Sequence, residues 1–219
     1  MEITSEIVDF FSTYSNDEYA KGMKKYMRDK FEFFGIKSPI RKEIQKKYFS
    51  VNKIPDNLVP FIKSLWMLPE RELQYFAMDI LFKIKKFWKE EYIDLFEWLI
   101  IHKSWWDTVD YIAARLIGEY FVEFPSKKLV LTNKWITSEN MWLERTAIIH
   151  QLSYGINTDW NLLKEFILFK IDSNEFFIQK AIGWALRQYA YKKPDIVLSF
   201  ANEFPLKPLS RREAFRRIT

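Results

Sequence analysis

The segment Lys103–Asp110 (KSWWDTVD) brings two tryptophans and two acids together at the start of a predicted helix. Residues four apart lie on one face of a helix, so Trp106 and Asp110 are expected to be neighbours. An indole face beside a carboxylate suits a cation, or a sugar on which positive charge develops. The alternative is a tryptophan that packs between helices and an acid that caps one. These eight residues alone slightly favour that alternative, and the rest of the chain changes the balance.

Helices must position this segment. The chain has 219 residues, 48% of them hydrophobic, with only 5 glycines and 8 prolines, which favours helices joined by short loops over turn-rich β folds. Apolar side chains recur at helical spacing, as in Tyr19, Met23 and Tyr26. Ser15–Asp17 should cap one helix, and Ser38 with Pro39 should begin another. No domain boundary is evident, so we expect one domain over residues 1–219.

A weak internal repeat indicates how the helices are stacked. The stretch from Asn140 aligns with that from Asn174 at an offset of 34, and small residues recur in the same frame. We expect stacked helices to approach closely at these residues: Ala77, Ala113, Ala147 and Ala181. A period of 34–36 with two helices per unit fits an all-α solenoid of HEAT-like repeats. Such arrays curve, so the fold should offer a concave face to an extended partner.

Positive charge gathers at both ends of the chain. The net charge is +5, yet residues 21–53 hold 11 Lys or Arg against 3 acids, a local +8. The segment from Lys207 is basic again, through Arg211, Arg212, Arg216 and Arg217. Two basic ends are typical of a protein that holds a polyanion on its concave face. Charge alone supports the alternative, that these residues form ordinary solvated helix faces, about equally well.

Composition also sets aside several classes of function. There is no cysteine, hence no disulfide or thiolate metal site, and His102 and His150 lie far apart in sequence. We expect no metal and no other cofactor. No apolar run is long enough to cross a membrane, and residues 1–6 do not resemble a signal peptide. A cytoplasmic protein, associated with the nucleoid in use and with no obligate protein partner, is the expectation.

Several blocks of sequence, in the same order, resemble the AlkD-like family of DNA alkylation repair glycosylases. They are Leu68–Glu72, Lys103–Asp110, Trp142–Arg145, Phe176–Trp184 and Pro208–Ala214. The resemblance extends along nearly the whole chain and implies a fold of HEAT-like repeats. It also implies an activity, because family members remove positively charged N3- and N7-alkylated purines from duplex DNA by hydrolysing the N-glycosidic bond, without flipping the base into a pocket.

The resemblance assigns roles to particular residues. The family's catalytic carboxylate falls on Asp110, and its two sugar-facing tryptophans fall on Trp106 and Trp184. Its arginine at the DNA backbone beside the lesion falls on Arg145, and a tyrosine of its N-terminal helices falls on Tyr26. Because all five residue types are kept, an active enzyme is implied.

Two positions depart from the family pattern. Ser153 replaces a lysine, which puts one backbone contact in doubt, and Lys37 replaces a neutral polar residue near Tyr26. Other basic side chains are expected to make sequence-independent phosphate contacts. They are Lys24, Lys25, Arg28, Lys37, Arg41, Arg211 and Arg212.

These residue types suit the chemistry. An alkylated purine that carries positive charge is already a good leaving group, so the difficult step is the charge that develops on deoxyribose. A carboxylate near C1′ stabilises this charge and can orient or deprotonate water. Alternative roles remain: Arg145 could pair with Glu144 or Glu139, and Asp107 could cap its helix. Two other functions stay open, a non-catalytic DNA-binding protein with the same fold and a protein-binding scaffold.

Overall fold

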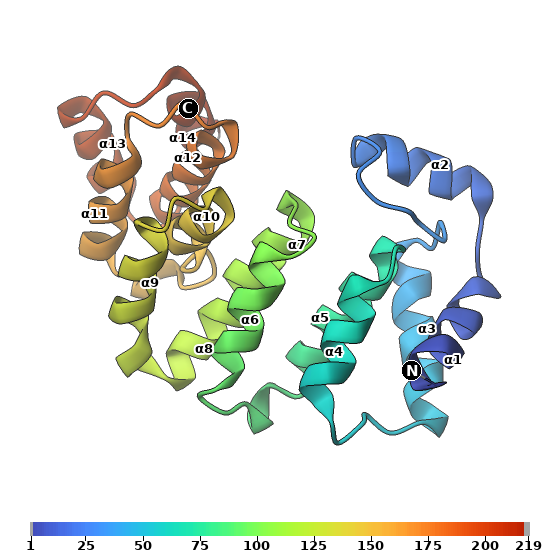
Figure 1. Ribbon diagram of the computed structural model, residues 1–219. Coiled ribbons are helices and arrows are strands. Elements are labelled where there is room, and N and C mark those ends of the chain that lie inside the picture. The colour runs from blue at the N-terminus through green and yellow to red at the C-terminus, as the bar shows by residue number, and fades with distance from the viewer. Residues whose placement is uncertain (1, 217–219) are drawn as a thin grey trace. The chain divides into compact units, whose positions relative to one another are not determined.

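The computed structural model describes residues 2–216, and every regular element among them is a helix (Figure 1). The predicted all-α class is therefore confirmed. Arg217, part of the predicted basic C-terminal segment, lies outside the described residues. Glu32 and Glu70 form an isolated parallel bridge. Within the described residues, no helix is both long and apolar enough to span a membrane.

The chain divides into two compact units, Met1–Lys86 and Phe87–Thr219. The single domain expected over residues 1–219, like its concave basic face, stays a prediction. The helices of unit 1 are α1 (Glu2–Ser12), α2 (Asp17–Tyr26), α3 (Ser38–Val51), α4 (Leu58–Met67), α5 (Arg71–Lys83) and the short η1 (Lys85–Phe87), which reaches the boundary.

The core of unit 1 is built around α5. Phe76, at its centre, has no exposed surface and meets Phe11 of α1 edge-on, with 5.1 Å between ring centroids. Trp66 of α4 is also fully buried. Helix α2, in contrast, has no buried residue and lies at one end of the unit (Figure 1).

Unit 2 continues the helical pattern with a larger core, in which Trp135, Phe96 and Phe166 are essentially buried. Its elements are α6 (Tyr92–Ile101), α7 (Trp106–Tyr111), η2 (Ile112–Ile117), α8 (Gly118–Glu123), η3 (Pro125–Lys127), α9 (Lys128–Ile136), α10 (Met141–Ile149), η4 (Gly155–Asn157), α11 (Trp160–Lys170), α12 (Phe176–Ala190), α13 (Pro194–Glu203) and α14 (Pro208–Phe215).

A regular repeat relates four of these helices, because α5, α7, α10 and α12 begin at residues 71, 106, 141 and 176, each 35 after the last. This spacing falls within the predicted period of 34–36. The four predicted alanines are 0–1% exposed, as expected where stacked helices approach closely.

Local sequence signals explain most helix boundaries. Asn16 caps α2 by accepting the backbone N–H of Tyr19, and Asn140 caps α10 in the same way. Proline occupies the first turn of α13 and α14. Helix α3 begins at Ser38 with Lys37 as its cap residue, so the predicted cap at Ser38 was wrong by one position.

A π-helical segment was not anticipated. Residues Ile112–Ile117 form π-helix η2 between α7 and α8, directly after Tyr111. Such wide turns are rare and are often found at functional sites. Here the segment begins two residues after Asp110.

Candidate functional site

The site is built around Asp110, in the last turn of α7. Helix α7 begins at Trp106, which puts Asp107 in its first turn, where a negative charge is favourable. Trp105 holds the N-cap position, so Asp107 lies two residues after the cap residue of α7. Asp110 follows one turn after Trp106, on the same face of the helix.

Arg145 of α10 holds the Asp110 carboxylate with a two-pronged contact. Its Nε donates to Oδ1 at 2.7 Å and its Nη2 donates to Oδ2 at 2.8 Å. The third nitrogen, Nη1, donates to the carbonyl oxygen of Phe177 on α12 at 2.5 Å. One guanidinium therefore ties α7, α10 and α12 together, with the strong geometry of a charge-assisted pair.

This pair occupies equivalent positions of adjacent repeats. Asp110 and Arg145 are each the fifth residue of their helix and lie 35 residues apart. We predicted both residues but not their contact, and the two alternative partners of Arg145 are not used, since Glu144 instead pairs with Lys170 at 2.6 Å. The repeat spacing was the signal that could have indicated it.

The environment of Asp110 is mostly closed. Its side chain is 16% exposed, against 4% for Arg145. Burial raises the pKa of the Asp110 carboxyl above its ordinary value, while the hydrogen bonds and charge of Arg145 act to lower it and the nearby charge of Asp107 raises it. The result is a carboxylate with a fixed orientation and a small accessible surface.

The position of Arg145 limits how this side chain could contact DNA. A bidentate grip on phosphate is not available in this geometry, because the guanidinium fork already faces Asp110 and the side chain is buried. Contact of its remaining N–H groups with DNA stays a prediction. In the structure, Arg145 positions the carboxylate.

Aromatic side chains back this ion pair. Trp142 and Phe177 lie 4.9 Å apart between centroids, and Trp105 meets both rings edge-on. The Phe177 ring also lies 5.9 Å from the Arg145 guanidinium. Trp105 is 8% exposed, as a tryptophan that packs between helices should be. The ion pair is therefore packed against one buried and two half-buried rings.

The two predicted sugar-facing tryptophans lie on helices that the ion pair connects. Trp106 is the first residue of α7 and Trp184 lies within α12, and both are half-buried. Gly183 allows α14 to pack against α12 here, because a Cβ at this position would lie 2.5 Å from Cβ of Glu213. The contact of Trp106 and Trp184 with a sugar stays a prediction.

The predicted DNA-binding residues of unit 1 gather on and around α2. Tyr26 is 69% exposed at the end of α2, and Lys25 and Arg28 are exposed beside it. Lys24 forms an ion pair with Glu32 at 2.5 Å. Lys37 places its ammonium 3.7 Å from the centroid of the Tyr19 ring, so this departure from the family pattern contacts α2 directly.

Arg41 has a different environment from the other cations. It is 8% exposed, forms an ion pair with Asp79 of α5 and lies 5.2 Å from the Tyr75 ring centroid. The expectation of a phosphate contact is corrected by this burial, because the guanidinium is already used to join α3 to α5. A cluster of basic residues in the sequence does not distinguish a buried cation from a surface one.

The C-terminal cations lie on α14. Arg211 and Arg212 are both exposed, and Arg211 donates to the carbonyl oxygen of Ala201 at 3.2 Å. Ser153, the other departure, is exposed and lines an open cleft of about 380 Å³ with Tyr154 and Gly118. Its hydroxyl donates to the carbonyl oxygen of Ala114 at 3.3 Å.

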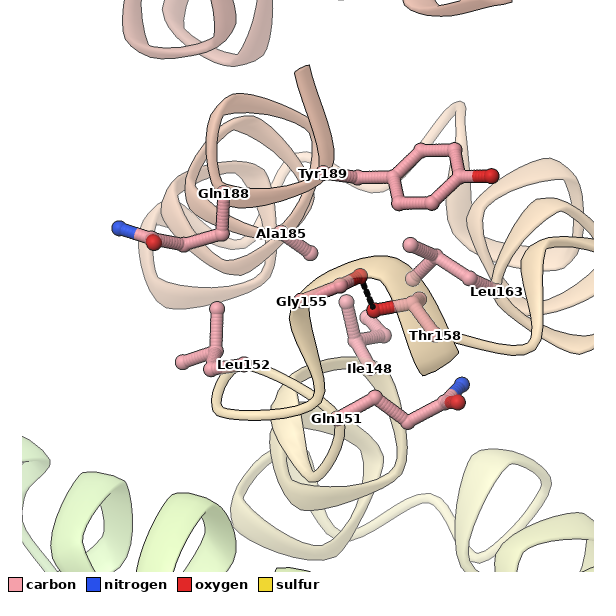
Figure 2. A pocket seen from close by; sticks show the side chains of 9 residues that line it. All are labelled: Ile148, Gln151, Leu152, Gly155, Thr158, Leu163, Ala185, Gln188 and Tyr189. Carbon is pink, nitrogen blue, oxygen red and sulfur yellow. Dashed lines mark hydrogen bonds between the residues drawn. The ribbon is translucent and has the colours of Figure 1, made fainter. Parts of the chain in front are cut away.

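The enclosed pocket in Figure 2 is too small for a nucleobase. It lies between the end of α10, α11 and α12, is lined by Ile148, Leu163 and Ala185 among others, and measures about 10 Å³, room for one water at most. No predicted site residue lines it. Among the residues that the structure describes, no group of three His, Cys, Asp or Glu side chains is placed to hold a metal ion.

Comparisons with known proteins agree with this architecture. The family model described as DNA alkylation repair enzyme matches residues 7–218. A solved structure of a predicted DNA alkylation repair enzyme from Enterococcus faecalis is 32% identical, with a TM-score of 0.84 over 94% of this chain and 97% of that one.

A second solved structure, AlkD2 from Streptococcus mutans, has a TM-score of 0.64 at 16% identity, over 89% of this chain and 98% of that one. It shows the shared fold, that of HEAT-like repeats. The comparison with curated proteins gave no match.

Proposed function

Because the chain belongs to the DNA alkylation repair enzyme family, we propose that it is a monofunctional DNA glycosylase for positively charged N3- and N7-alkylated purines in duplex DNA. The observation that carries the proposal is the Asp110 carboxylate. Its side chain keeps 16% of its surface exposed, and Arg145 fixes its orientation. A carboxylate in this setting is suited to a developing cation.

The reaction is a hydrolysis. The C1′–N bond of the cationic nucleotide breaks and its electron pair returns to the base, which leaves as a neutral alkylpurine. Positive charge develops on deoxyribose, where Asp110 stabilises it and orients the water whose oxygen bonds to C1′. The proton of that water passes to Asp110 or to solvent, and an abasic site remains. No lysine nucleophile is used, so the strand is not cut.

Selectivity follows from the charge of the lesion. In this proposal, the π faces of Trp106 and Trp184 stabilise the cationic nucleotide by about 0.5–2 kcal/mol, and they offer no comparable advantage to a neutral base. Because the base already leaves readily, no pocket that reads its edge is required, and the proposal includes no base flipping.

The exposed cations supply the affinity for duplex DNA. Lys25, Arg28 and Tyr26 in unit 1 and Arg211 and Arg212 in unit 2 are available for phosphate or sugar contacts. Phosphate contacts release bound counterions, so we propose that binding weakens steeply as salt concentration rises.

The test is an assay of base release from a duplex methylated at N7 of guanine and N3 of adenine. The proposal predicts free 7-methylguanine and 3-methyladenine, no release of unmodified guanine, and abasic sites that break only on alkali treatment. Binding to the duplex without release of any base would instead identify a non-catalytic DNA-binding protein. The absence of binding at moderate salt would leave the protein-binding scaffold.

A further inference from the structure

The position of helix α2 requires an explanation, because no residue of this helix is buried. Its apolar residues Tyr19 and Tyr26 are 41% and 69% exposed. A helix of this length is not stable in water on its own. Its cations are central to the proposed function, on which this inference rests, so whatever holds α2 determines how they are presented.

The segment Phe31–Ile36 holds α2 from one side. The backbone N–H of Asn16, the cap residue of α2, donates to the carbonyl oxygen of Phe34 at 2.7 Å. Gly35 has a φ of +84°, and a Cβ there would lie 2.0 Å from the Asn16 carbonyl oxygen and 2.7 Å from the Ala20 nitrogen. The first turn of α2 therefore rests directly on this backbone.

Glu72, in the first turn of α5, holds the same segment from the other side. Its carboxylate accepts the backbone N–H groups of Phe34 at 3.2 Å, Gly35 at 2.9 Å and Ile36 at 3.0 Å. Glu72 is 1% exposed, and the segment is also joined to α5 by the Arg71 N–H, which donates to the Glu32 carbonyl oxygen at 2.8 Å.

We propose that Glu72 is a positioning residue for DNA binding, which anchors Phe31–Ile36 to α5 and thereby fixes α2 and its cations. An ionised carboxylate has acceptors on both oxygens and no donor, so it can accept all three converging N–H groups. Because Oε1 accepts two of these donors and Oε2 accepts the third, an amide in place of the carboxylate sets its NH2 group against at least one of them, the N–H of Phe34. A buried donor without its acceptor is unfavourable, so the segment and α2 should loosen together.

The first experiment measures amide hydrogen exchange in the free protein for E72Q and for the control E70Q. Glu70 is two residues earlier, and its side chain makes no capping hydrogen bond. We expect E72Q to raise exchange at least tenfold in residues 17–36 while α10 and α12 keep the parent's protection, and E70Q to change neither region. Unchanged exchange in α2 of E72Q overturns the inference.

The second experiment measures duplex binding and the rate of base release at saturating enzyme. Replacing Glu72 by glutamine removes a negative charge, so a pure charge effect would strengthen DNA binding, as E70Q should report. If Glu72 positions α2, E72Q should do the opposite: its Kd for duplex DNA should rise about tenfold and depend less steeply on salt concentration. The saturated rate should stay within about threefold of the parent, because unit 2 carries the chemistry.

A double-mutant cycle tests whether Glu72 acts through α2. Lys25 and Arg28 are exposed, so K25Q/R28Q should weaken DNA binding by itself. If Glu72 acts by positioning these cations, E72Q should cost much less affinity in that background than in the parent. Full additivity contradicts the inference.

The outcomes separate this inference from the proposed function. If the parent is active and E72Q matches it in hydrogen exchange and DNA affinity, the positioning role of Glu72 is overturned and the proposed glycosylase activity stands. A parent that releases no base, while E72Q still loosens α2, overturns the glycosylase and supports the anchor.

Discussion

Two carboxylates, the buried Glu72 of unit 1 and the half-buried Asp110 of unit 2, lie in consecutive 35-residue repeats but have different partners. Glu72 is 1% exposed and accepts three main-chain N–H groups. Asp110 is held by the guanidinium of Arg145 and keeps 16% of its side chain exposed. Burial raises the pKa of both.

The different partners determine what each carboxylate can do. The acceptor capacity of Glu72 is directed at its own chain, which suits it to hold a loop. The carboxylate of Asp110 is held by Arg145 and keeps part of its surface exposed, which suits it to act on a bound substrate. Each prediction below alters one part of this contrast.

Removal of Arg145 should break the contrast most severely. R145A leaves a buried carboxylate without its partner, a loss of about 3–5 kcal/mol in the free energy of unfolding. Because Arg145 lowers the pKa of Asp110, its loss should raise that pKa further. The reaction needs the carboxylate, so its acid limb should move to higher pH. Denaturant unfolding and a pH–rate profile measure the two effects.

R145K is the control, since it keeps the charge but not the fork. The acid limb of the pH–rate profile of R145K should lie closer to that of the parent, although R145K should still release base slowly. A parent-like rate and profile for R145A would show that Arg145 does not position Asp110.

His150 extends the comparison to a buried group that stays neutral. Burial lowers its pKa to about 4, with Lys128 adding to this and the Ala147 carbonyl and Asp159 opposing it. The unfolded state takes up a proton near pH 6.5 while the folded state does not, so stability should be full above about pH 6.5 and fall by about 3 kcal/mol as pH drops toward 4.

H150F should flatten this part of the stability–pH curve, whatever its stability at pH 7. Urea unfolding from pH 7.5 to 4.5 measures it. An equal fall in the variant would assign the pH dependence to other groups.

Trp184 tests the proposed contact of an indole face with the cationic nucleotide. W184L removes the π face and should slow release of the cationic base by roughly 2- to 30-fold, the equivalent of 0.5–2 kcal/mol, whereas W184F should retain part of the rate. Single-turnover release of 7-methylguanine is the measurement. Equal rates for W184L and W184F would return Trp184 to a packing role.

The smallest effects are expected from the surface cations of α14. R212Q should lower the slope of log Kd against log salt by about 0.9, the contribution of one phosphate contact. R211Q should lower it less, because Arg211 already donates to Ala201 and lies 5.2 Å from the Phe215 ring centroid. Parent slopes in both variants would place the duplex elsewhere.

The sequence predicted elements better than contacts between them. Proline and cap residues indicate where α2, α13 and α14 begin, because these signals act within a few residues. The Asp110–Arg145 pair joins residues 35 apart and depends on how two helices stack, which no local pattern reports. The burial of Arg41 against Asp79 across 38 residues escaped prediction for the same reason.

Glu72 shows a second limit. An acid in the first turn of a helix is ordinarily solvated, and its charge interacts favourably with the helix dipole. Nothing near Glu72 in sequence indicates that the backbone N–H groups of Phe34–Ile36 donate to it. The π-helical segment after Asp110 is also invisible locally, since its residues resemble any apolar helix.

The most direct test of the account is the single-turnover rate of 7-methylguanine release at saturating enzyme, for the parent, D110N and D107N. Asp107 is the matched control, a carboxylate on the same short helix. We predict that D110N slows release by about 10²- to 10³-fold with duplex affinity retained, and that D107N stays near the parent. A D110N rate equal to the parent's would remove Asp110 from the chemistry and contradict the account.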